Sequence, residues 1–149
     1  MLIKSICNPE AVSCGATTTV VEAAALMRKH HVGDLVVVGE PTRDQVPLGV
    51  VTDRDLVVEV LGLGLDPATT RVGAIVRKPV VVAHDNEEVP QVIERMKTHG
   101  VRRIPVVDRS GALAGIITLD DLLGLVAADL AALAGLVAQQ SGRERRARR

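Results

Sequence analysis

The chain shows the same succession of apolar patterns twice. In the first copy a short β segment at 11–13 precedes a helix, whose apolar residues recur every three or four positions across 20–27. Two short strands rich in valine and leucine follow at 35–38 and 48–51, and a second helix begins at Thr52. The pattern predicts the order β-α-β-β-α, and strands this apolar predict a sheet that is covered on both faces.

The second copy repeats this order at 80–83, 89–96, 104–107 and 114–117, and its last helix begins at Thr118. We expect a turn between the paired strands of each copy and an N-cap before each first helix. The predicted turns are Glu40-Pro41 and Ser110-Gly111, and the predicted N-caps are Thr17 or Thr18 and Asp85 or Asn86.

Shifting the sequence against itself supports an internal repeat. Shifted by 69 residues, Val20 and Met27 align with Val89 and Met96; shifted by 66, GVVTDRDLV aligns with GIITLDDLL. The difference between the two shifts arises in the turn between the paired strands, where insertions cost little free energy. We divide the chain into a first motif at 5–60, a linker at 61–73, a second motif at 74–127, and a C-terminal helix extension with a basic tail at 128–149.

One such unit is too small to bury a sizeable core alone. We therefore expect the two sheets to pack face to face around a pseudo-twofold axis, in an α/β (α+β) fold with an extended C-terminal helix.

Composition narrows the range of functions. The chain has no Phe, Trp or Tyr, which removes the aromatic platforms on which single-stranded nucleic acids stack. Eighteen basic residues balance eighteen acidic ones, so no global field attracts nucleic acid or membranes. The spacing of Cys7 and Cys14 matches no zinc or redox signature. The N-terminus does not resemble a signal peptide, and we expect a soluble cytoplasmic protein.

The C-terminal segment carries an apolar stripe at helical spacing, formed by Leu122, Leu123, Val126, Leu130, Leu133 and Val137. We expect it to prolong the last helix and to pack on the body of the chain or on a second chain. A membrane span is the disfavoured alternative, since 122–138 reaches only about 26 Å as a helix and has Asp129 near its midpoint. The terminal RERRARR is expected to be a disordered solvated tail, with binding to an anionic surface as the alternative.

The motif Gly-apolar-apolar-Thr-x-x-Asp, at 49–55 and 115–121, carries the most chemical information. Its structural interpretation is a capping box, in which the threonine and the acid exchange hydrogen bonds with each other's backbone amides. Its functional interpretation uses the same groups: a threonine hydroxyl at a helix start suits a phosphate, and a carboxylate suits the two hydroxyls of a ribose. No glycine-rich phosphate loop accompanies the motif.

These features, together with the phrases HHVGDLVVV and HGVRRIPVVD, resemble a pair of CBS domains. This regulatory module is named after cystathionine β-synthase and is also called a Bateman module. The resemblance covers residues 5–127. It implies two clefts between the sheets that bind AMP, ADP, ATP or S-adenosylmethionine, each combining the Thr-x-x-Asp of one repeat with the first strands of the other.

The two implied clefts differ in charge. One combines Thr52 and Asp55 with Val101, Arg102 and Arg103, and the other combines Thr118 and Asp121 with Val32, Gly33 and Asp34. Arginine binds phosphate through charge-assisted hydrogen bonds, whereas an aspartate repels it. We expect a di- or triphosphate to prefer the first cleft. The second would be empty or hold a ligand with no anionic end. The alternative for the two arginines is a solvated loop pair.

The expected function is a non-catalytic regulatory homodimer that senses an adenosine-containing ligand and signals to a partner protein, without an obligatory cofactor or metal. The alternative is a structural or nucleic-acid-associated adaptor that acts through its basic tail with empty clefts. His30 and His99 fall at helix C-termini, where histidine suits the helix dipole. Cys7 lines an adenine pocket by the resemblance, or else is a small buried apolar residue.

Overall fold

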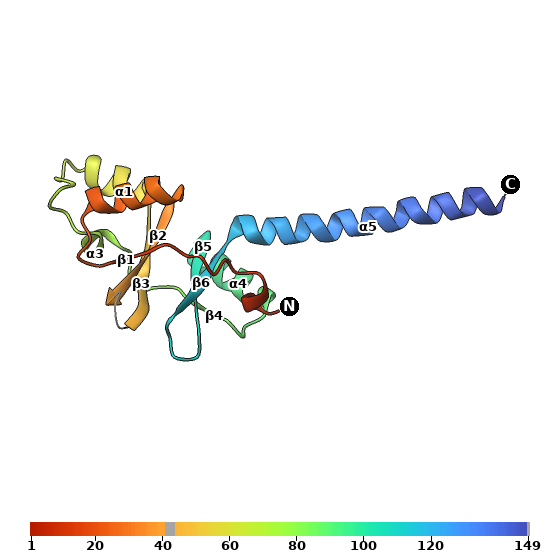
Figure 1. The fold of residues 1–149 in the computed structure, drawn as a ribbon, viewed down its shortest axis with the longest axis horizontal. Coiled ribbons are helices and arrows are strands. Elements are labelled where there is room, and N and C mark those ends of the chain that lie inside the picture. The colour runs from red at the N-terminus through yellow and green to blue at the C-terminus, as the bar shows by residue number, and fades with distance from the viewer. Residues whose placement is uncertain (41–43, 149) are drawn as a thin grey trace. The chain divides into compact units, whose positions relative to one another are not determined.

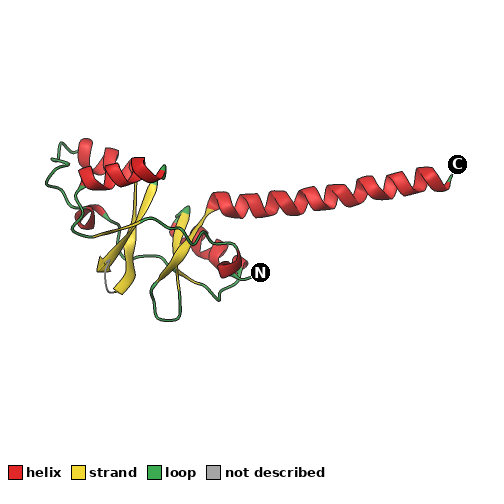
Figure 2. Cartoon of the chain, viewed as in Figure 1, coloured by secondary structure: helices red, strands yellow, loops and turns green. Residues whose placement is uncertain are grey.

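The computed structural model describes residues 1–40 and 44–148, and it divides into two compact units, Met1–Ile117 and Thr118–Arg149. The first unit contains two three-stranded sheets with their helices; Figure 2 draws strands in yellow and all helices, including that of the second unit, in red. The second unit is a single helix. The predicted turn at Glu40-Pro41 includes Pro41, which lies outside the described residues.

The first repeat follows the predicted order and builds the sheet β1-β2-β3 (Figure 1). The strand β1 pairs in parallel with β2, and β2 pairs antiparallel with β3 in a register that sets Leu35 opposite Val51. A helical segment then runs from α2 into a π-helical turn, η2. The elements are β1 (Ser13–Gly15), α1 (Val20–His30), β2 (Asp34–Glu40), β3 (Asp44–Thr52), α2 (Asp53–Leu56) and η2 (Val57–Leu61).

The second repeat builds the sheet β4-β5-β6 with the same order and the same parallel first pair. A short helix, α3, precedes it and begins inside the expected linker. A 3-10 turn, η1, lies near the N-terminus. The elements are η1 (Ile3–Ser5), α3 (Val72–Ile75), β4 (Ala83–His84), α4 (Val89–His99), β5 (Arg103–Val107), β6 (Leu113–Thr118) and α5 (Leu119–Ala147).

The caps of the two first helices differ from the prediction. Helix α1 is capped by Thr19, whose hydroxyl accepts from the Glu22 amide 3.2 Å away while the Glu22 carboxylate accepts from the Thr19 amide. Thr17 and Thr18 were wrong because neither has an acid three residues on to close the box.

Helix α4 is capped by Glu88 rather than by Asp85 or Asn86. The Asp85 amide donates to the Val107 carbonyl at 3.0 Å, so this residue still belongs to the strand pairing. Strand β1 begins two residues later than expected and β4 three residues later, because their pairing with the neighbouring strands starts at Ser13, opposite Val36, and at Ala83, opposite Val106.

Strand β2 is buried on both faces, as its composition predicted. Leu35 and Val37 belong to a core cluster with α1 residues such as Ala23 and Met27, whereas Val36 and Val38 pack with Ile116 of β6. Successive side chains of a strand point to opposite faces, so this alternation places the helices on one face and the second sheet on the other. The two sheets therefore pack face to face, which confirms the predicted architecture.

The repeats exchange their leading segments. The Ile3 amide donates to the Glu87 carbonyl at 2.9 Å, and Asn8 exchanges two backbone hydrogen bonds of 2.9 Å with Ile116 of β6. The N-terminal segment thus completes the second repeat.

The linker completes the first repeat in return. The amide of Val72 donates to the Thr18 carbonyl at 2.9 Å, and the amide of Gly73 donates to the Ala16 carbonyl at 3.0 Å. This reciprocal exchange is what a pseudo-twofold arrangement requires, and it ties the repeats into one unit.

Helix α5, drawn in blue in Figure 1, continues to Ala147. The expectation of a disordered tail was therefore wrong for residues 143–147, while Arg149 lies outside the described residues. Within α5, Leu122 is buried and most of the apolar stripe is exposed. By length and composition, α5 is apolar enough to cross a membrane, a test that core helices of soluble proteins also pass.

An ion pair fixes the start of α4. Arg95 on α4 donates through both terminal nitrogens to the Glu87 carboxylate, and its Nη1 also donates to the Val82 carbonyl at 2.8 Å. The bonds from Arg95, together with one from the His84 amide, lower the pKa of Glu87 despite its partial burial.

Removal of this ion pair should destabilise the protein in a pH-dependent way. A carboxyl with a lowered folded-state pKa stabilises the fold above its unfolded pKa and loses that effect as pH falls through the folded pKa. We expect Arg95→Ala to lower the free energy of unfolding by about 1–2 kcal/mol near neutral pH, and by less at about pH 3. Urea denaturation across this range measures it. Lys97→Ala, which removes an exposed 3.8 Å pair with Glu94, is the control and should change little at either pH.

Candidate functional site

A pocket of about 400 Å³ lies in the first unit, where β3 and the start of α2 meet the segments before β4 and β5. Its size is in the range of small-molecule sites, roughly 300–1,000 Å³. Both repeats contribute to it, and it brings together all five residues predicted for the first cleft. The lining residues are Gly49, Val50, Thr52, Asp53, Arg54, Asp55, Arg77, Pro79, Val80, Val81, Gly100, Val101, Arg102, Arg103 and Pro105.

Thr52 and Asp55 form a capping box at one side of this pocket. The Thr52 amide donates to Asp55 Oδ2 at 2.9 Å, and the Asp55 amide donates to Thr52 Oγ1 at 3.1 Å. Both residues are half-buried and line the pocket, so the structural and the functional interpretations hold for the same groups. Across the described residues no hydrogen bond engages Asp55 Oδ1, which leaves an acceptor for a ligand hydroxyl.

The equivalent pair in the second repeat, Thr118 and Asp121, forms the same capping box at the start of α5. Here the Thr118 hydroxyl also donates to Asp121 Oδ2 at 2.8 Å. In the described part of the chain Thr52 makes no such third bond, so its hydroxyl proton remains available to a ligand oxygen. The two caps are therefore not chemically equivalent.

Arginines dominate the charge of the pocket. Its lining contains Arg54, Arg77, Arg102 and Arg103 against Asp53 and Asp55. Arg102 and Arg103 were predicted from the sequence, whereas Arg54 and Arg77 were not. Arg54 occupies a variable position inside the Thr-x-x-Asp motif, and a basic residue there was the available signal. Arg77 is brought in by the segment that crosses between the repeats, which the repeat pattern does not locate.

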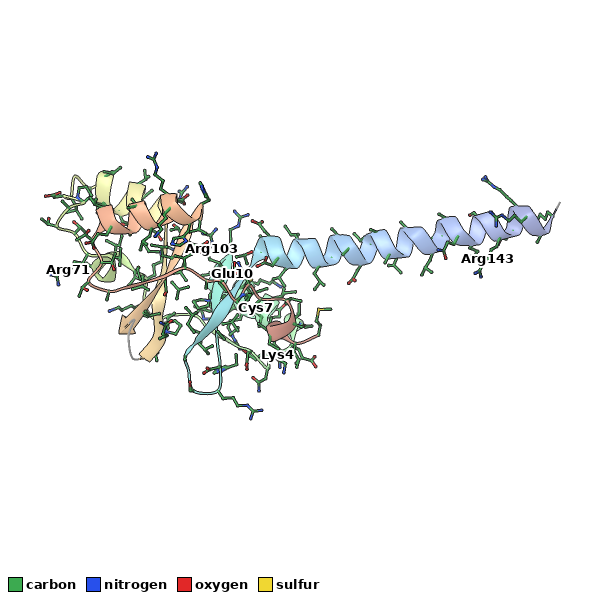
Figure 3. All side chains as sticks on the ribbon, in the orientation of Figure 1. Lys4, Cys7, Glu10, Arg71, Arg103 and Arg143 are labelled. Atoms are coloured by element: carbon green, nitrogen blue, oxygen red, sulfur yellow. The ribbon has the colours of Figure 1, made fainter. Side chains whose placement is uncertain are left out.

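Arg103 is held by an ion pair inside the first unit. Its Nη1 lies 3.0 Å from Asp34 Oδ2, and both side chains are mostly buried (Arg103 is labelled in Figure 3). Burial raises the pKa of the Asp34 carboxyl, Arg103 opposes this rise, and the nearby Asp53 adds to it. Arg102, by contrast, is exposed. The structure thus joins two residues that the sequence analysis assigned to different clefts.

Val32 and Gly33, predicted for the second cleft together with Asp34, are fixed by the first repeat. The Val32 amide donates to the Met27 carbonyl at 3.1 Å, and the Gly33 carbonyl accepts from the Asp53 amide at 3.0 Å. A binding role for these residues with Thr118 and Asp121 stays a prediction.

The two histidines and the cysteine considered in the sequence analysis lie outside the lining of the pocket. His30 ends α1 and His99 ends α4, as predicted, and His99 Nδ1 lies 2.9 Å from the Arg95 carbonyl oxygen. Cys7 lies beside β6, where its Sγ approaches Gly115 (Figure 3). Among residues 1–40 and 44–148, no three His, Cys, Asp or Glu side chains are grouped so as to hold a metal ion.

The family model of the CBS domain matches residues 3–62 and 72–128. The chain therefore belongs to the CBS domain family and carries a pair of these domains, which are regulatory modules. This agrees with two sheets of identical order that pack face to face.

Several relatives share this pair. The uncharacterized protein MK0525 of Methanopyrus kandleri is 35% identical over 121 residues, which are 81% of this chain and 60% of that protein. Hypoxic response protein 1 of Mycobacterium tuberculosis is 34% identical over 119 residues, 80% of each chain. A crystal structure of Hypoxic Response Protein I with two coordinated zinc ions has a TM-score of 0.74 at 32% identity, covering 83% of this chain and 97% of that one.

Two similar structures contain adenosine-derived ligands. The CBS domain pair of protein MJ0100, in complex with 5'-methylthioadenosine and S-adenosyl-L-methionine, has a TM-score of 0.75 at 25% identity and covers 87% of this chain and 98% of its own. CBS domain protein PAE2072 from Pyrobaculum aerophilum, complexed with AMP, has a TM-score of 0.72 at 26% identity and covers 82% and 90%. Both of these similar CBS proteins thus hold adenosine-containing ligands.

Proposed function

We propose that this chain is a non-catalytic, cytoplasmic regulatory module that binds an adenosine nucleotide in the pocket of Thr52 and Asp55 and passes the signal to a partner protein. The observation that carries the proposal is the composition of this pocket: a hydroxyl and carboxylate pair, an apolar wall and an excess of arginine line one cavity. The ligands of the similar CBS pairs support it.

Each part of a nucleotide has a matching group in the pocket. Asp55 Oδ1 is an acceptor suited to the ribose hydroxyls, since a carboxylate accepts hydrogen bonds and donates none. Val50, Val80 and Val81 give an apolar surface for the adenine ring, which compensates for the absence of aromatic residues. The arginines suit phosphate oxygens through charge-assisted bonds.

The arginine excess favours AMP, ADP or ATP over S-adenosylmethionine, whose sulfonium is cationic. Regulation requires that the ligand bind one arrangement of the two repeats better than another, because a ligand of equal affinity for both shifts nothing. The pocket meets the structural condition for this, since it takes groups from both repeats. We further propose that the module acts as a homodimer.

A thermal-shift panel of AMP, ADP, ATP, S-adenosylmethionine and GTP tests the proposal. A ligand at 100 times its Kd stabilises the native state by about 2.7 kcal/mol, and we expect a shift of this size with an adenine nucleotide. Asp55→Ala should reduce the shift strongly. Glu22→Ala removes the acid of a capping box outside the pocket and is the control, with the shift retained. No shift with any adenosine-containing ligand would overturn the proposal.

A further inference from the structure

Helix α5 carries a face of exposed apolar residues. Its residues follow steps of three, four, three and four, which places them on one side of a helix. Each is at least 51% exposed. They are Leu123, Val126, Leu130, Leu133 and Val137, and we call this set the α5 stripe. A continuous exposed apolar face of this kind marks an interaction surface.

The two ends of α5 carry opposite charge. Asp120, Asp121 and Asp129 lie in its first half, whereas its last turns carry Glu144 and a cluster of arginines at positions 143, 145, 146 and 148. The helix dipole favours acids at the start and bases at the end of a helix. It does not account for the exposed stripe between them.

We propose that two copies of the chain associate through the α5 stripe with their α5 helices antiparallel. In this orientation the acidic end of each helix lies beside the arginine cluster of the other, whereas a parallel pair would bring two arginine clusters together. A register with Leu130 opposite Leu133 of the second copy also sets Val126 opposite Val137, so that the stripes pack on each other in alternating layers.

This interface gives the homodimer proposed above a surface and an orientation. It rests on residues of α5 alone and stands whether or not the pocket binds a nucleotide. A membrane surface is the other environment that suits an apolar face with basic residues beyond it. The charged Asp129 flanks the stripe, where an antiparallel partner tolerates it better than hydrocarbon does.

Sedimentation velocity of the full chain tests the surface. We expect the wild-type chain to form dimers, and Leu130→Asp/Leu133→Asp to weaken their association by more than about tenfold, since charges would enter the interface. Ala128→Asp/Ala131→Asp adds the same charges at exposed positions off the stripe and should leave association unchanged. A monomeric wild-type chain, or dimers that tolerate the stripe substitutions, would overturn the proposal.

Disulfide cross-linking tests the orientation. A mixture of Val126→Cys and Val137→Cys chains should form the mixed disulfide under mild oxidation, while each variant alone should cross-link no more than the wild-type chain, which controls for Cys7 and Cys14. Cross-linking of each variant with itself would show a parallel pair and contradict the proposal. A membrane-bound monomer would also contradict the proposal. In that case the chain would form no dimer in solution but would float with phosphatidylglycerol vesicles, and Leu130→Asp/Leu133→Asp would abolish this flotation.

Discussion

Replacing Gly115 with alanine is expected to lower the free energy of unfolding by about 3 kcal/mol or more. A Cβ at this position would lie 2.6 Å from the Asn8 carbonyl oxygen and 3.1 Å from Cys7 Sγ. The Asn8 backbone cannot withdraw without breaking its two hydrogen bonds to Ile116, which attach the N-terminal segment to the second repeat. Urea denaturation measures the loss.

Gly39→Ala is the matched control for this substitution. Gly39 also lies in a strand, but a Cβ there would meet no atom of residues 1–40 and 44–148 within 4 Å, so the variant should be as stable as the wild type. If Gly115→Ala and Gly39→Ala unfold at the same urea concentration, the N-terminal segment is not held against β6 in solution.

Substitutions at the two ends of the Arg103–Asp34 ion pair should change nucleotide affinity in opposite directions. Arg103→Ala removes a charge-assisted phosphate contact and should weaken ATP binding by about ten- to a hundredfold. Asp34→Asn removes the carboxylate that holds Arg103 at 3.0 Å, so the guanidinium is released to the phosphates and ATP should bind several-fold more tightly. Calorimetric titration measures both changes.

Adenosine and Arg109→Ala provide the controls. Adenosine has no phosphate, so its affinity should be nearly the same for the wild type, Arg103→Ala and Asp34→Asn. Arg109 is exposed and does not line the pocket, so its loss should leave the affinity for ATP unaltered. Unchanged ATP affinity in Arg103→Ala would remove this residue from the phosphate site.

The internal repeat and the five residues predicted for the first cleft could be read from the sequence because they depend on local patterns. The alignment of GVVTDRDLV with GIITLDDLL predicted both capping boxes. The segment HGVRRIPVVD located Arg102 and Arg103. Thr17, Thr18 and Thr19 offer the same hydroxyl, so the choice among them depended on Glu22, which lies three residues after Thr19.

What the sequence did not predict are the contacts made by the exchanged segments. The motif glycines show this best. A Cβ at Gly49 would lie 2.2 Å from Val76 Cγ2, just as one at Gly115 would meet Asn8. Each glycine is thus required by a segment from elsewhere in the chain that crosses over it. The same crossing brings Arg77 into the pocket, and it cannot be inferred from periodicity because it is set by tertiary packing.

A crystal structure of the chain grown with ATP tests the central claim most directly. We expect adenosine density in the pocket, with the ribose hydroxyls within hydrogen-bonding distance of the Asp55 carboxylate and the phosphates against Arg77, Arg102 or Arg103. Nucleotide bound elsewhere while this pocket stays empty at saturating ATP would contradict it.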